Sequence, residues 1–304
     1  MTKKEILETI ELRQSTLGTW LSCPNMYKFR HIDKLEPSFR YPATLHGSAL
    51  HDVLETLHNG HWDDDLLEMY STALHYQLYK SDEAHIPLRW KRDKDSEIEA
   101  FKKNAVEILE NYRSKDYNKE ALVLFSETKF RVKILGNLFT GTMDQVRKNR
   151  DGSIELIDFK SSAMKPNRYA IINNIQLSLY AYALKFGEVL IHDSWVKPNL
   201  LVDSVGIYFL RAHEVYKRKV VGSEIGDEKG DPFYRTTKSL EDLRAFRQEI
   251  RSLLNAMLRP WYYPNIASCA FCSYTEHCVS RNDTIGDKEA LEAQALLAEL
   301  NMAS

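Results

Sequence analysis

The sequence predicts an α/β fold in which a central mixed sheet is flanked by helices and joined to a helical lobe. Strand-like runs lie in the middle of the chain, and segments with helical periodicity lie before and after them. With 304 residues, of which 43% are hydrophobic and 28% charged, the chain has the composition of a globular protein that buries a sizeable core. We predict one domain over residues 1–280 and a tail over residues 281–304, whose alanine- and leucine-rich sequence is typical of a helix.

The first elements are expected to be helices. Short helices over residues 17–29 are interrupted at Cys23, and Pro24 is expected to open the second of them because proline is tolerated in a first helical turn. Apolar residues recur at helical spacing over residues 48–57, which predicts a further helix. His51 lies on or beside the apolar stripe of that helix.

Residues 58–120 are predicted to form a helical insertion, or lobe, because their apolar residues recur with helical periodicity among many charged ones. The lobe carries a basic cluster that includes an aromatic side chain: Arg89, Trp90, Lys91 and Arg92. Such a cluster could contact phosphates and stack on the bases of single-stranded DNA. A solvated helix face is the alternative that the composition leaves open.

The centre of the chain has the pattern of β-strands at residues 122–132, 137–147 and 154–160. Asp151 and Gly152 form a tight-turn signal between the last two runs, so we predict that these two strands pair as a hairpin. The pattern beyond them predicts a helix over residues 171–186, a buried strand over 205–210, a glycine- and acid-rich loop over 222–231 and an amphipathic helix over 240–258.

Charge and hydropathy exclude some classes of protein. The formal net charge is -2, so a DNA-binding surface has to be a local basic patch. The first residues lack the apolar core of a secretory signal, and no run approaches the roughly 18 apolar residues of a membrane span. We therefore expect a cytoplasmic, intracellular protein without a membrane partner.

Two acids and a lysine are predicted to meet on neighbouring strands. Asp158 and Lys160 are separated by one residue, so their side chains project to the same face of a strand, and Asp144 lies on the adjacent strand. Asp144, Asp158 and the carbonyl of Phe159 would supply the hard oxygen ligands that Mg²⁺ and Mn²⁺ prefer. Such a cation polarises a phosphate and activates water for phosphodiester hydrolysis, and Lys160 would stabilise the developing charge. On spacing alone, a strand-edge charge pair remains the alternative.

The surroundings of these residues form three motifs, which are Gly-x-x-Asp at 141–144, Asp-x-Lys at 158–160 and Gln-x-x-x-Tyr at 176–180. Their order resembles the RecB-like branch of the PD-(D/E)XK nucleases, which have a restriction-endonuclease-like core. The resemblance implies that Asp144 and Asp158 bind metal, that Lys160 is catalytic, and that Gln176 and Tyr180 complete the site.

The resemblance also implies a histidine ligand from an upstream helix. His51 follows Gly47 at the spacing of the family's Gly-x-x-x-His pattern, whereas His46 and His58 are nearby competitors. A packed or solvated histidine is the alternative. An imidazole ligand would favour Mn²⁺ over Mg²⁺. Glu127 lies one strand earlier, where relatives often carry an acid.

Four cysteines are present, and the last three have the compact spacing Cys-x2-Cys-x5-Cys: Cys23, Cys269, Cys272 and Cys278. A four-thiolate site could hold zinc or a 4Fe-4S cluster, and buried cysteines are the alternative. The set resembles that of AddB-type subunits and of CRISPR-associated adaptation nucleases, which implies a 4Fe-4S cluster. Such a cluster would join the two ends of the chain as a structural staple.

These observations predict a metal-dependent DNA nuclease. The resemblance implies an exonuclease acting on single-stranded ends, with possible endonuclease activity, in recombination, repair, phage DNA metabolism or CRISPR adaptation, where other proteins of those machines would be its partners. A catalytically inactive DNA-binding adaptor with the same fold is the second hypothesis. No G-x-x-x-x-G-K-[ST] segment is present, so the sequence contains no P-loop for ATP hydrolysis.

Overall fold

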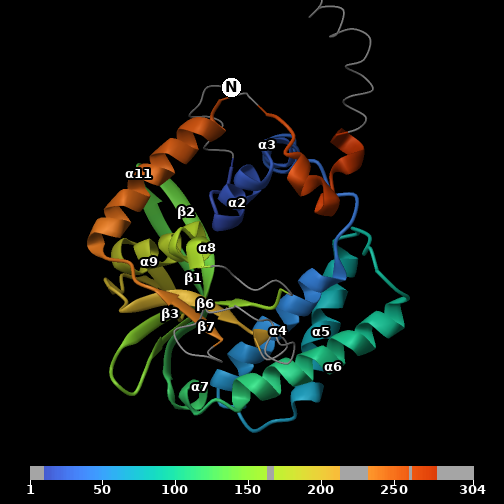
Figure 1. Ribbon diagram of the computed structural model, residues 1–304, viewed down its shortest axis with the longest axis vertical. Coiled ribbons are helices and arrows are strands. Elements are labelled where there is room, and N and C mark those ends of the chain that lie inside the picture. The colour runs from blue at the N-terminus through green and yellow to red at the C-terminus, as the bar shows by residue number, and fades with distance from the viewer. Residues whose placement is uncertain (1–9, 163–167, 213–231, 260–261, 279–304) are drawn as a thin grey trace, which may run out of the picture.

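The computed structural model describes residues 10–162, 168–212, 232–259 and 262–278. The loop predicted over residues 222–231 and the tail predicted over residues 281–304 lie outside the described residues. Helices lie to both sides of one sheet, as Figure 1 shows. No helix in the described part of the chain is long and apolar enough to cross a membrane.

Seven strands form one mixed sheet in the order β5-β4-β1-β2-β3-β6-β7. The strands are β1 (Leu122–Ile134), β2 (Asn137–Lys148), β3 (Ile154–Lys160), β4 (Glu188–Ile191), β5 (Ser194–Val196), β6 (Ser204–Phe209) and β7 (Phe233–Thr236). Strands β3 and β6 pair in parallel, and the other neighbours pair antiparallel. The predicted mixed sheet is therefore confirmed.

The hairpin predicted between β2 and β3 is also confirmed. Gln145 pairs with Ile157 across the two strands. Gly152 in the turn has a φ of 89°, which glycine adopts without strain, and the Asp151 carboxylate accepts a hydrogen bond from the Ser153 amide at 2.9 Å. The hairpin places the second half of β2 beside β3. Asp144 on β2 and Asp158 on β3 therefore lie on neighbouring strands.

The helices separate into two groups around the sheet (Figure 1). Helices α2 (Gln14–Ser22), α9 (Ile175–Phe186) and α11 (Leu240–Met257) share one hydrophobic core with the sheet. A second core unites α4 (Pro42–His58), α5 (Leu66–Glu83) and α6 (Lys94–Arg113) with side chains of the opposite sheet face. The segment predicted as a lobe is thus helical, and α7 (Asp116–Glu120) connects it to β1.

Alternation along β3 explains why the sheet has two cores. Leu156 packs in the core with α9, whereas Ile157 and Phe159 pack in the core with α4. Because Asp158 and Lys160 share the face of Leu156, they are directed toward the α9 side. Asp158 and Lys160 therefore lie on the sheet face that α9 covers.

The structure corrects the helix predicted over residues 171–186. Helix α8 (Arg168–Ile172) ends before α9 begins at Ile175, because the Asn174 side chain accepts a hydrogen bond from the Leu177 amide and caps a new helix. The short strands β4, β5 and β7 were not predicted, and α4 begins at Pro42 rather than near residue 48.

The two ends of the described chain lie side by side, next to α3 (Pro24–Tyr27) and the 3-10 helix η2 (Ile266–Phe271), as Figure 1 shows. The Asn265 side-chain amide donates a hydrogen bond to the Ser22 carbonyl at 2.7 Å, and the Ser268 hydroxyl donates to the same carbonyl at 2.8 Å. A π-helical turn, η1 (Lys28–Ile32), follows α3. These contacts bring the first cysteine close to the last three.

Candidate active site

The acid from β2 is fixed against β3 by the backbone. The Phe159 amide donates a hydrogen bond of 2.7 Å to Asp144 Oδ2, and Asp144 is buried. Lys160 Nζ lies 2.7 Å from Asp158 Oδ2, as expected for side chains on the same face of one strand. The structure therefore brings Asp144, Asp158 and Lys160 together.

The Asp158 carboxylate is unusual because it is fully buried, at 0% exposure, and poorly satisfied. Its contact with Lys160 is an ion pair, but neither oxygen accepts a well-directed hydrogen bond from the described residues. Burial and the charge of Asp144 raise the pKa of Asp158, although Lys160 opposes them. A divalent cation would supply the missing partner, so these residues fit a Mg²⁺ or Mn²⁺ ion.

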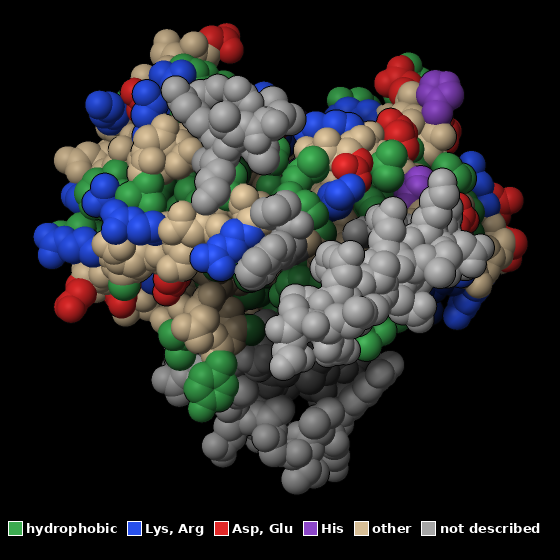
Figure 2. Space-filling view, turned by 90° about the horizontal axis from the view of Figure 1, so that it is seen from above, with side chains coloured by type: hydrophobic (Ala, Val, Ile, Leu, Met, Phe, Trp, Pro, Cys, Tyr) green, Lys and Arg blue, Asp and Glu red, His purple; other side chains and the backbone are tan. Residues whose placement is uncertain are grey.

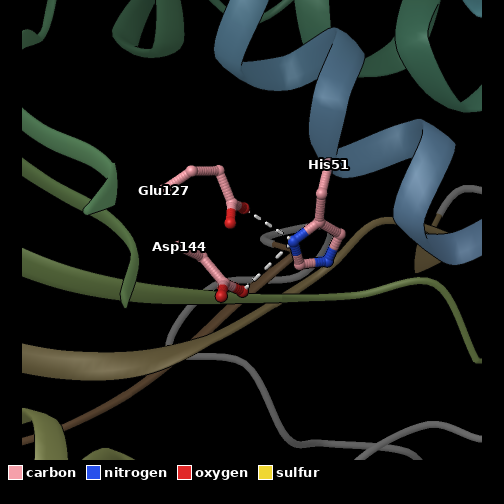
Figure 3. A group of neighbouring side chains, drawn as sticks. All are labelled: His51, Glu127 and Asp144. Carbon is pink, nitrogen blue, oxygen red and sulfur yellow. Dashed lines mark hydrogen bonds and ion pairs between the residues drawn. The ribbon is translucent and has the colours of Figure 1, made fainter. Parts of the chain in front are cut away.

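A second part of the candidate metal site comes from α4 and β1. His51 Nδ1 lies 3.0 Å from Glu127 Oε1 and 3.7 Å from Asp144 Oδ2. One donor atom from each of these three residues lies within 4.8 Å of the others. Figure 3 shows the imidazole reaching down from its helix toward the two carboxylates on the strands. The other ring nitrogen, Nε2, lies 3.2 Å from the Phe159 carbonyl oxygen. The two ring nitrogens therefore face different groups, the carboxylates at Nδ1 and the backbone carbonyl at Nε2.

Glu127 contributes more to this arrangement than its sequence context indicated. Its φ is +41°, which is unfavourable for a residue with a side chain. Backbone strain of this kind costs about 1 kcal/mol or more and is concentrated at functional sites. The sequence signals were an acid at 127 inside a strand pattern, which surface exposure would explain equally well, and the acid that relatives often carry there.

The charge state of His51 depends on the surrounding acids. Burial by itself lowers the pKa of His51, but the hydrogen bond that His51 donates to Glu127 and the charges of Asp144, Glu127 and Asp158 raise it to about 9. The imidazole is therefore protonated at neutral pH in the cation-free protein, and a bound cation would have to displace that proton. His51 thus holds the acidic cluster together when no cation is bound.

A hydrogen-bonded chain runs from the lysine to the start of α9. Lys160 Nζ donates to Gln176 Oε1 at 3.3 Å, and Gln176 Nε2 donates to the Tyr180 hydroxyl at 2.7 Å. Burial and the charges of Asp144 and Asp158 raise the pKa of Tyr180, so the phenol stays neutral. The predicted common face of Gln176 and Tyr180 is confirmed, and both residues reach the acids through Lys160.

The four cysteines gather where the chain ends meet. The Asn265 amide donates to Cys23 Sγ at 3.4 Å, and the Asn25 side chain donates to Cys278 Sγ at 3.8 Å. Burial raises the pKa of the Cys272 thiol, and the neighbouring Cys23, Cys269 and Cys278 sulfurs raise it further. All four are free thiols. The early cysteine therefore lies near the three late ones, and their binding of a shared metal centre stays a prediction.

The basic cluster of the lobe is partly engaged within the protein. The Arg89 guanidinium lies 4.8 Å from the centre of the Phe39 ring. The backbone amides of Lys91 and Arg92 donate to one oxygen of the buried Glu97 carboxylate, at 2.8 and 3.2 Å. Trp90 is half-buried, whereas the side chains of Arg89, Lys91 and Arg92 are exposed. Their contact with DNA stays a prediction.

The chain belongs to the PD-(D/E)XK nuclease superfamily, because the model of that family matches residues 11–279. No curated protein matches the sequence. Among solved structures, a candidate exonuclease from Eubacterium rectale is 11% identical, with 89% of this chain and 88% of that chain covered and a TM-score of 0.48. The protein SSO0001 is 13% identical, with 90% and 93% covered and a TM-score of 0.30.

Proposed function

We propose that this chain hydrolyses phosphodiester bonds in DNA with the help of a divalent cation, and that it acts on single-stranded ends as an exonuclease. The observation that carries the proposal is the fully buried Asp158 carboxylate, which lies beside Asp144 and has the Lys160 ion pair as its one polar contact from the described residues. Burying a charged carboxylate costs free energy, and a bound cation would compensate for that cost. Membership in a nuclease superfamily supports the same reaction class.

The cation would be held by residues from three elements. Asp144 on β2 and Asp158 on β3 supply carboxylates, and His51 on α4 supplies Nδ1. Glu127 and the Phe159 carbonyl complete the set of available donors. When bound, the ion would polarise the scissile phosphate and lower the pKa of water. Imidazole among the ligands supports Mn²⁺ as well as Mg²⁺.

Lys160 is the residue suited to act on the phosphate itself. Its side chain is 38% exposed, and its ammonium is held 2.7 Å from Asp158 Oδ2. Attraction by Asp158 and Asp144 outweighs burial and raises the pKa of Lys160, so it stays charged. A fixed positive charge at this place stabilises negative charge that develops on the phosphate. Gln176 would orient it through the 3.3 Å hydrogen bond.

We further propose that the four cysteines hold a 4Fe-4S cluster, as in RecB-like relatives of the AddB and CRISPR adaptation types. The gathering of all four sulfurs where the two chain ends meet supports a shared four-thiolate site. Four thiolates can also hold zinc, so metal analysis of the purified protein distinguishes the two centres.

Cleavage of end-labelled single-stranded DNA and of circular DNA, with Mg²⁺, Mn²⁺ or EDTA, tests the proposal. We expect cation-dependent loss of the linear strand, loss of that activity in Asp144→Ala, and normal activity in Asp151→Ala, which alters an exposed turn. Cut circles would add endonuclease activity. DNA binding without any cleavage would instead identify an inactive adaptor and overturn the catalytic proposal.

A further inference from the structure

A basic groove lies away from the acidic site, where the end of α9 meets β1 and α11. It consists of two adjoining hollows of about 490 and 400 Å³ that share Lys133 and Phe186. The residues that matter here, which we call the Phe186 groove, are Arg131, Lys133, Phe186, Lys197, Arg244 and Arg247. None of them takes part in the candidate active site.

The groove carries a surplus of positive charge. Arg131 is paired with Glu188 at 2.6 Å, so these two charges offset each other. In the part of the chain that the structure describes, no acidic side chain lies within ion-pairing distance of Lys133, Lys197, Arg244 or Arg247. All four are exposed. The groove can therefore attract a polyanion.

The basic residues of α11 form a row that continues the groove. Leu243, Phe246 and Ile250 are buried in the core that α11 shares with α9, so the helix has a fixed solvent face. Arg244, Arg247 and Arg251 recur on that face at helical spacing. Figure 2 shows Lys and Arg side chains gathered toward the side of the molecule on which α11 lies in Figure 1.

Aromatic rings stand beside these charges. Phe186 is 50% exposed, and its ring centre lies 4.7 Å from that of the buried Tyr182, which supports it from behind. Trp195 is 37% exposed and carries the Arg131 guanidinium 4.3 Å from its ring centre. In proteins that bind single strands, exposed aromatic rings stack on the nucleobases, and neighbouring cations contact the phosphates.

We propose that the Phe186 groove is a second binding site for single-stranded nucleic acid, which holds the strand away from the site of hydrolysis. Phe186 follows Gln176 by ten residues on α9, or about 15 Å along the helix. About five stacked nucleotides would span that distance at about 3.4 Å each. The proposal rests on the proposed function for the nature of the ligand.

Fluorescence anisotropy measures the affinity for a labelled oligo(dT) strand of about 20 nucleotides and so tests this site. The buffer contains EDTA, so the strand is not hydrolysed during the measurement. For the full-length Arg244→Glu/Arg247→Glu variant we expect about tenfold weaker binding, and a slope of log K against log salt reduced by about 1.4, since each contact with a single-strand phosphate contributes about 0.7. Phe186→Ala should weaken binding about fivefold or more to oligo(dT), but not to an abasic strand of equal length.

The matched control is Lys148→Glu/Arg150→Glu, which makes the same change of charge at the opposite end of β2, about 35 Å away. It should leave both affinity and salt slope nearly unchanged. Equal losses in the two double variants would overturn the proposal, because they would indicate general attraction only. Unchanged affinity in Arg244→Glu/Arg247→Glu, or equally tight binding of poly-glutamate, would also overturn it. Cleavage by the unchanged protein is measured in a separate assay with divalent cation. That assay tests the proposed hydrolysis independently of the second binding site.

Discussion

Asp158 is buried beside a second carboxylate, and its charged form therefore costs the cation-free protein stability. Both acids have a raised pKa, mainly because of burial, and neither oxygen of Asp158 accepts a hydrogen bond from the described residues. Active sites commonly sacrifice stability in this way for function. The cost of the Asp158 charge can be measured separately from cleavage.

Replacement of Asp158 by Asn should abolish cleavage and raise stability. The raised pKa means that the folded state binds the proton more tightly than the unfolded chain, so stability is lost as pH rises through the window above 3.8. At pH 8 in EDTA, Asp158→Asn should therefore unfold at a higher temperature than the unchanged protein. The expected gain in free energy of unfolding is about 1 kcal/mol. The measurement is thermal unfolding with a parallel cleavage assay.

Asp151→Asn provides the control, because Asp151 lies in an exposed turn. It should leave cleavage intact. Normal cleavage by Asp158→Asn would rule out a role for Asp158 as a metal ligand, and a strong loss of stability would show that its ion pair with Lys160 outweighs the cost of burial.

At the scale of elements, a buried ion-pair network ties three strands and one helix together. Arg147 on β2 contacts Glu155 on β3 through two hydrogen bonds of 3.0 and 2.8 Å, and Arg235 on β7 contacts the same carboxylate at 2.9 Å. Arg147 also donates to Oδ1 of the Asn118 side chain on α7 at 2.9 Å. One carboxylate thus compensates two cations across the sheet.

Glu155→Gln should destabilise the protein by about 3 kcal/mol, because it removes the buried carboxylate that pairs with the buried Arg147. Burial raises the pKa of Glu155, but Arg147 and Arg235 lower it below its ordinary value of 4.5. Its contribution to stability is therefore present above pH 4.5 and is lost as pH falls through the lower, folded-state value. Urea unfolding of the unchanged protein and of Glu155→Gln, at neutral and acid pH, measures the difference in their free energies of unfolding. That difference should be smaller in acid.

The surface pair of Arg150 and Glu120 supplies the comparison for that network. Glu120→Gln should change the free energy of unfolding by less than about 1 kcal/mol. A similar loss in both variants would contradict the special role of the buried network.

Strand β7 depends on a glycine in β6. A Cβ at position 206 would lie 2.3 Å from the Tyr234 carbonyl oxygen and 2.8 Å from Cε2 of Phe233. Gly206→Ala should therefore force the two strands apart and cost about 2 kcal/mol or more in urea unfolding. Gly18→Ala, which meets no atom closer than 3.7 Å inside α2, should be neutral or slightly stabilising, and equal losses would contradict the steric argument.

For the whole molecule, the contact between the chain ends is the feature that the cysteines would reinforce. Direct hydrogen bonds already join these ends, as between Asn25 N and the Tyr263 carbonyl at 3.3 Å. A shared cluster would close a loop of nearly the whole chain and restrict the unfolded state. The cluster is therefore expected to act on folding rather than on hydrolysis.

Cys272→Ser should reduce bound iron, visible absorption and stability together in anaerobically purified protein, and should expose residues 262–278 to limited proteolysis. The physical reason is that a missing thiolate loosens the closure of the chain. Ser273→Ala, one residue away, should retain iron and resistance to protease. A fully stable Cys272→Ser variant would contradict the staple, and zinc in place of iron would contradict the 4Fe-4S proposal.

Local periodicity was sufficient to predict the long elements and the composition of the site. The strands β1, β2 and β3 and the helix α11 were predictable because each has a face buried in a core, which leaves a regular pattern in the sequence. The meeting of Asp144, Asp158 and Lys160 was predictable from spacing, since one strand and its hairpin partner suffice to bring them together, whereas their roles came from the resemblance. His51 required the resemblance as well, because its partners lie on strands far along the chain.

Only the tertiary structure decided what depends on distant contacts. The strands β4, β5 and β7 have three or four residues each, too few for a readable period, and the break before α9 depends on a single capping side chain, that of Asn174. The strained Glu127 and the Phe186 groove arise where elements remote in sequence meet. The sequence by itself determined the long elements and the residue types of the site, whereas tertiary packing decided which of these residues share a surface, because such contacts leave no local periodicity.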